Sequence, residues 1–116
     1  MVFTVEEIED FTVPIGETEI FLRIMHLENG LSVFISSSSK PRLGQIALAS
    51  PPTLGDSEPS SSSLFGMDQE AVLVRTIAER VAVWTNQSCL VVISVKNLTR
   101  SLVMEILRAL KSHLLS

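Results

Sequence analysis

Apolar and polar residues alternate over much of the first half of the chain, a pattern that predicts β-strands. Two such runs, 19–28 and 31–38, are separated only by Asn29-Gly30. Because this dipeptide favours the backbone conformation of a two-residue turn, the sequence predicts a β-hairpin at this point.

Two further strands are predicted before and after this hairpin. Residues 43–50 alternate again and follow a break at 40–42, so we expect a third strand after a tight turn and an antiparallel meander of three strands. Upstream, residues 11–15 form a short predicted strand that contains Pro14. Since proline cannot donate a hydrogen bond to a neighbouring strand, this strand belongs at an edge of the sheet.

The second half of the chain predicts two amphipathic helices. From 68 to 86, apolar residues recur every three or four positions and charged residues fall between them. Thr99 is a good N-cap for a second helix. The predicted buried stripe of that helix consists of Leu102, Val103, Ile106, Leu107, Leu110 and Leu114.

A strand of a different kind is predicted between the helices, at 89–97. Six of the seven residues from Cys89 to Val95 are apolar. Such a run is typical of a strand covered on both faces, so we expect it in the centre of the sheet.

Residues 51–66 contain three Pro, two Gly and five Ser, which leaves little apolar surface to bury. This composition predicts a flexible Ser/Pro-rich loop. The 116 residues otherwise suit one domain, 1–116, of α/β (α+β) class, with a mostly antiparallel sheet of five to six strands and two helices.

The predicted sheet has apolar residues on both faces. Alternation places Ile20, Leu22 and Ile24 on one face and Phe21, Arg23, Met25 and Leu27 on the other, and Phe34 is expected on the second face as well. Two helices can cover one face, so a partner molecule would have to cover the other. The alternative is that the helices divide between the faces and the domain is a monomer. The candidate protein-binding residues are Phe21, Arg23, Met25 and Phe34.

Composition narrows the functional classes. The chain is 46% hydrophobic and 19% charged, which favours a folded protein, and its net charge of −4 with nine scattered Lys and Arg argues against a nucleic-acid ligand. The single Cys89, the acidic start and the absence of a long apolar run predict a protein of the cytoplasm or the nucleus that does not enter a membrane.

Catalytic signatures are missing from the sequence. Of the two histidines, His26 lies in a predicted strand and His113 in the last turn of a predicted helix, and we expect both to be structural. The acidic run 6–10 is typical of a solvated segment, no glycine spacing fits a phosphate-binding loop, and no serine lies in a nucleophile motif. We therefore expect no enzyme activity, no metal and no cofactor.

The order of meander, Ser-rich loop, helix, buried strand and second helix resembles the proteasome assembly chaperone 4 family over residues 19 to 115. The stretches that carry the resemblance are IFLRIMHLENGLSVFISS (20–37), SSSLFGM (61–67) and AERVAVWTNQSCLVVISVKN (78–97). They are patterns of hydrophobicity and loop placement, and none of them is a catalytic signature.

This resemblance implies a non-enzymatic chaperone that binds proteasome α-type subunits and promotes α-ring assembly of the core particle. It also implies sheet-to-sheet pairing with a similar partner, assembly chaperone 3, as a heterodimer, or with a second copy as a homodimer. A small adaptor of the roadblock or longin type, which scaffolds a GTPase or trafficking complex, is the alternative.

Overall fold

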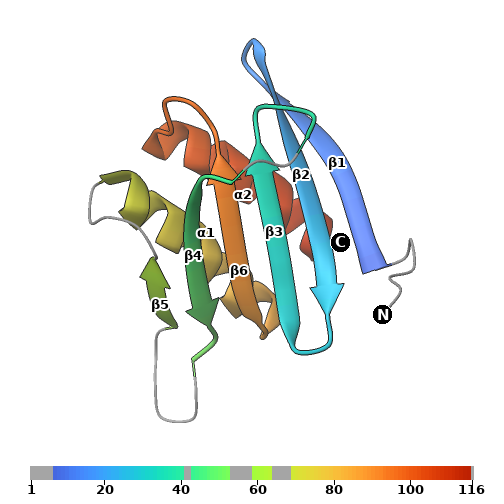
Figure 1. Cartoon of the computed structure of the whole chain (residues 1–116), viewed down its shortest axis with the longest axis vertical. Coiled ribbons are helices and arrows are strands. Elements are labelled where there is room, and N and C mark those ends of the chain that lie inside the picture. Colours follow the sequence, from blue (N-terminus) through green and yellow to red (C-terminus); the bar gives the residue numbers. More distant parts are fainter. Residues whose placement is uncertain (1–6, 41–42, 53–58, 64–68, 116) are drawn as a thin grey trace.

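A computed structural model describes residues 7–40, 43–52, 59–63 and 69–115 of the chain. They form one six-stranded sheet with two helices on the same side of it (Figure 1). In chain order the elements are β1 (Ile8–Ile15), β2 (Thr18–Leu27), β3 (Gly30–Ser36), β4 (Gln45–Ser50), β5 (Ser60–Ser63), α1 (Gln69–Thr85), β6 (Ser88–Ser94) and α2 (Arg100–Leu114).

The strand order is β1-β2-β3-β6-β4-β5. Only β3 and β6 pair in parallel, and the other four pairs are antiparallel. The α+β class, the strand number and the mostly antiparallel sheet are therefore confirmed, with the qualification that the sheet is mixed. The edge position predicted for the strand containing Pro14 is also confirmed, although β1 is longer than expected.

The predicted three-strand meander is wrong at its third strand, because β4 pairs with β6 and not with β3. Residues 37–44 separate β3 from β4. A connection of that length does not require the two strands it joins to lie side by side, whereas a two-residue hairpin turn does. The gap between β3 and β4 is filled by β6, the apolar strand predicted to lie centrally, whose Cys89, Val91 and Ile93 are buried.

The hairpin between β2 and β3 is confirmed, but its turn is shifted by one residue. Leu27 pairs with Gly30, so the turn consists of Glu28 and Asn29. Gly30 is needed for another reason: a Cβ atom added to it would lie 2.4 Å from the main-chain oxygen of Ser88. Glycine at this position therefore lets β6 approach the start of β3.

Both predicted helices are confirmed, and each has a clear end signal. Thr99 caps α2, since its side-chain oxygen accepts a hydrogen bond from the Leu102 amide at 3.2 Å. At the end of α1, Asn86 adopts a left-handed backbone with φ of 53°, and the amide of Gln87 donates to the Ala82 carbonyl. The chain can therefore leave α1 and enter β6 within two residues.

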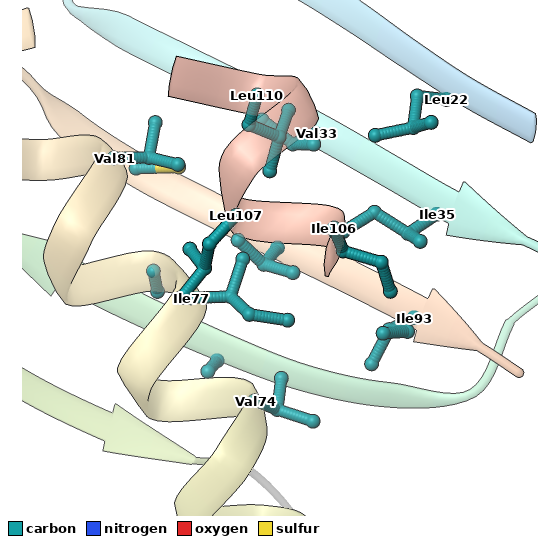
Figure 2. Close-up of a cluster of buried hydrophobic side chains, with 14 of the residues drawn as sticks. Leu22, Val33, Ile35, Val74, Ile77, Val81, Ile93, Ile106, Leu107 and Leu110 are labelled. Carbon is teal, nitrogen blue, oxygen red and sulfur yellow. The ribbon is translucent and has the colours of Figure 1, made fainter. Parts of the chain in front are cut away.

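The hydrophobic core lies between the helices and one face of the sheet. Figure 2 shows Val33 and Ile35 of the sheet facing Ile77 of α1 and Ile106 of α2. Ile20, Leu22 and Ile24 of β2 belong to the same core, as alternation predicted. Because both helices use this face, neither covers the opposite one.

The segment 51–66, predicted to be a flexible loop, contains a strand. Residues Ser60–Ser63 form β5 and pair with the outer edge of β4, while 53–58 and 64–66 lie outside the described residues. Strand pairing uses backbone groups, so a polar serine run can still complete a sheet edge. In addition, the Ser61 hydroxyl donates to Glu79 of α1.

Replacing Gly30 with alanine should destabilise the fold by about 3 kcal/mol, because the new methyl group meets a backbone oxygen that cannot move without displacing β6. Gly16 is the matched control. It has φ of 62° with nothing near its absent Cβ, so Gly16→Ala should cost only about 1 kcal/mol. Urea unfolding measures both, and equal losses would contradict the close approach at Gly30.

Candidate functional site

The sheet face opposite the helices carries all four residues predicted to bind protein. Phe21, Arg23 and Met25 lie on β2 and Phe34 lies on β3, and each is only partly buried. Arg23 is the cross-strand partner of Phe34. The structure therefore places these side chains together on one surface.

The sequence analysis missed the continuation of this surface across β6 and β4. Phe34 of β3 lies beside Val92 of β6, and Val92 lies beside Ile46 of β4. A second row contains Leu90 and the half-exposed Leu48. We call the whole surface the open face; its residues are Phe21, Arg23, Met25, Ser32, Phe34, Ser36, Ile46, Leu48, Leu90 and Val92.

The centre of the open face is well packed although no helix covers it. Val92 is only 3% exposed, and Ser32 and Ser36 are buried beside the larger side chains of neighbouring strands. The serine side chains are small, so Phe34 stands between them on β3. A partner would meet a continuous surface of apolar side chains and small hydroxyl groups.

An ion pair borders the open face. Arg23 Nε lies 2.7 Å from Asp10 Oδ1 and its Nη2 lies 3.0 Å from Oδ2, which makes a two-point contact between β2 and β1. The hydrogen bond from Arg23 lowers the pKa of Asp10, and the same contact raises the pKa of Arg23. Arg23 therefore presents a neutralised pair to a partner, not an isolated positive charge.

Next to this ion pair, the open face contains a pocket of about 360 Å³. Phe21, Phe34 and Thr12 contribute to its wall, and the Ser36 hydroxyl there accepts a hydrogen bond from the Ser38 amide at 3.0 Å. Its described lining contains no histidine or cysteine. Its wall therefore combines aromatic rings with hydroxyl groups and with the Asp10–Arg23 ion pair.

A separate polar cluster joins β1, β2 and α2 on the helix side of the sheet. Glu9 accepts hydrogen bonds from His26, at 2.5 Å, and from His113. Phe11 stacks on His113 with ring centroids 4.3 Å apart. The hydrogen bond to His113 is the largest cause of a lowered pKa at Glu9, followed by the one to His26. Glu9 and Asp10 therefore make side-chain bonds that the sequence did not suggest, although both side chains remain partly exposed to solvent.

Cys89, the single cysteine of the chain, is buried. Burial raises the pKa of Cys89 to about 12, so its thiol stays protonated and is a poor nucleophile. Within the described ranges, no three histidine, cysteine or acidic residues are placed to hold a metal ion. In the same part of the chain, no helix has both the length and the apolar character to cross a membrane.

The chain is similar to one protein family in sequence and to a solved structure in fold. Residues 15–114 match the model of the family described as prenylated flavin chaperone LpdD-like domain. No curated protein matches the sequence. A chain of a solved chaperone complex for yeast 20S proteasome assembly has a TM-score of 0.61 and 14% identity, over 93% of this chain and 98% of that one. At 14% identity, the similarity to the yeast chain shows a shared fold and nothing more.

The lowered pKa of Glu9 predicts a pH-dependent contribution to stability. A carboxyl group whose pKa is lower in the folded state stabilises the fold above its ordinary pKa of 4.5, and this stabilisation is lost as the pH falls toward the folded-state pKa. Glu9→Gln should therefore lower the melting temperature at pH 7 and have little effect near pH 3. Glu17→Gln, at the exposed β1–β2 turn, is the matched control. An equal effect of Glu9→Gln at both pH values would contradict the prediction.

Proposed function

The chain belongs to the family of prenylated flavin chaperone LpdD-like domains, and we propose that it acts as a non-enzymatic chaperone that binds other proteins. The observation that carries the proposal is the open face, since both helices pack on the other side of the sheet. Partly buried apolar side chains, such as Phe21, Phe34 and Ile46, on a sheet face that no helix covers are typical of a surface that another protein covers.

We infer that the first partner is a protein of similar fold, either a different chaperone or a second copy of this chain. Two sheets can pack face to face about 10 Å apart, with the helices of each protein on the outside. In such a pair, Phe34 would lie close to the interface centre, with Val92 and Ile46 beside it. A stable interface buries about 1,600 Å² in total, and a surface extending from β2 to β4 can contribute one side of it.

The proposed clients are α-type subunits of the proteasome, and the proposed action is to promote α-ring assembly in the cytoplasm or the nucleus. Two observations support this assignment. The sequence resembles the proteasome assembly chaperone 4 family, and the fold is similar to that of a chain from a chaperone complex for yeast 20S proteasome assembly. The partner in the dimer would then be an assembly chaperone 3-like protein.

A second candidate follows from the description of the matching family, which names a prenylated flavin. On this alternative the chain would bind a flavin cofactor and not a proteasome subunit. Titration with flavin mononucleotide, monitored by flavin fluorescence, separates the two candidates. Saturable binding of the flavin by the isolated chain would favour this alternative.

We expect the tagged chain to recover proteasome α-type subunits and a small partner chaperone under conditions that preserve assembly intermediates, and to be absent from mature proteasomes. Mass spectrometry of the recovered proteins is the measurement. Recovery of GTPases or coat components instead would favour the roadblock or longin-type adaptor, and recovery of neither class would contradict the proposal.

Phe34→Asp should weaken pairing by roughly 100-fold or more, because it removes the burial of a large apolar side chain and introduces a charge into a dry contact. The fold should change little, since Phe34 points away from the core. Sedimentation with and without the partner, beside a thermal melt, measures both properties.

The matched control for this variant is Val83→Asp. Val83 is 47% exposed on α1, away from the open face, so the same kind of substitution there should leave pairing unchanged. Normal pairing of Phe34→Asp, or equal weakening by both variants, would show that the open face is not the interface.

A further inference from the structure

A groove with a volume of about 540 Å³ runs between α1 and α2, on the side of the molecule opposite the open face. Leu73, Trp84 and Leu107 are partly or fully buried and contribute apolar surface to it. Val72 is 46% exposed and Met104 is 56% exposed, so one apolar side chain from each helix is accessible at the groove.

The charged residues that line this groove are all positive. Four of the nine Lys and Arg of the chain line it, namely Arg80, Arg100, Arg108 and Lys111, and no acidic residue belongs to its lining. This is unusual for a chain with a net charge of −4. The groove is therefore a positively charged site on an acidic protein.

Two of these cations have partners inside the protein. Arg108 bonds to Glu105 at 3.0 Å, and the Lys111 ammonium lies 5.9 Å from the centre of the Trp84 ring. Arg80 and Arg100 are exposed, and among the described residues no carboxylate lies within salt-bridge distance of either. These two side chains are available to an external anion.

The groove has the length of a short helix. Its α1 wall extends from Val72 to Trp84 and its α2 wall from Arg100 to Lys111. At 1.5 Å per residue, each wall spans about 16–18 Å, or roughly three helical turns. An amphipathic helix of three turns can place apolar residues at spacings of three and four along such a groove.

We propose that the α1–α2 groove binds an acidic amphipathic helix of a partner protein. The apolar side of that helix packs on Leu73, Met104 and Leu107, and its carboxylates face Arg80 and Arg100. A concave site on a protein of net negative charge suits a helix better than an anionic membrane, which requires apolar groups that protrude. The proposal does not depend on pairing through the open face, because the two surfaces lie on opposite sides of the sheet.

The probe is a fluorescein-labelled synthetic helix of roughly 14 residues, with leucines at spacings of three and four and glutamates elsewhere. We expect saturable binding by fluorescence anisotropy that weakens as salt rises from about 50 to 300 mM, because screening reduces the attraction of exposed charges. A peptide with lysine in place of every glutamate should not bind.

The charge variant is the double substitution Arg80→Glu and Arg100→Glu, which should reduce affinity by about tenfold or more. Its matched control is Lys40→Glu with Lys96→Glu, which changes the net charge equally at exposed positions outside the groove. Met104→Gln should also weaken binding, whereas Val83→Gln, at an exposed position on α1 outside the groove, should not.

Met104→Gln keeps the proposal testable if the double charge variant fails to fold, which circular dichroism would show. The proposal is overturned if both peptides bind equally, if the double variant and its control weaken binding equally, or if Met104→Gln leaves affinity unchanged. It is also overturned if the protein binds phosphatidylserine vesicles through Arg80 and Arg100 and does not bind the glutamate peptide.

Discussion

The packing of both helices against one face of the sheet is the constraint on which the rest of the structure depends. It gathers Ile20, Val33 and Ile77 into a single core, and it leaves Phe34 and Val92 on a face that neither helix covers. Burial of apolar surface stabilises the first face within one molecule. On the second face, Val92 is already buried by its neighbours, whereas Phe34 is only partly buried, so a partner can bury the apolar surface that remains there. The asymmetry that completes the core therefore also creates the candidate interface.

Local patterns were enough to predict both helices and every strand except β5. The spacing of apolar residues predicted both helices, and Thr99 was identified as a cap because its hydroxyl group can satisfy a helix amide within the same turn. The position of β4 was not predictable in this way. Alternation in 43–50 determines which side chains share a face, but it carries no information on which strand lies beside them.

The candidate site was predicted in part for a similar reason. Alternation separated Phe21 and Phe34 from the core residues, but the nearly continuous apolar run of β6 concealed that Leu90 and Val92 lie on the open face. The bond between Glu9 and His113 joins residues 104 positions apart. Such a contact depends on the final packing of α2 beside β1, and no spacing rule in the sequence points to it.

The place of β6 between β3 and β4 has a consequence for how the protein is made. Because the segment 37–87 separates β3 from its parallel partner, this pairing has a high contact order and forms late. During synthesis, the edges of β3 and β4 that pair with β6 in the finished sheet remain unpaired until the ribosome has released β6. Unpaired strand edges can associate with other chains. A protein proposed to promote the assembly of other chains would thus pass through an aggregation-prone stage of its own.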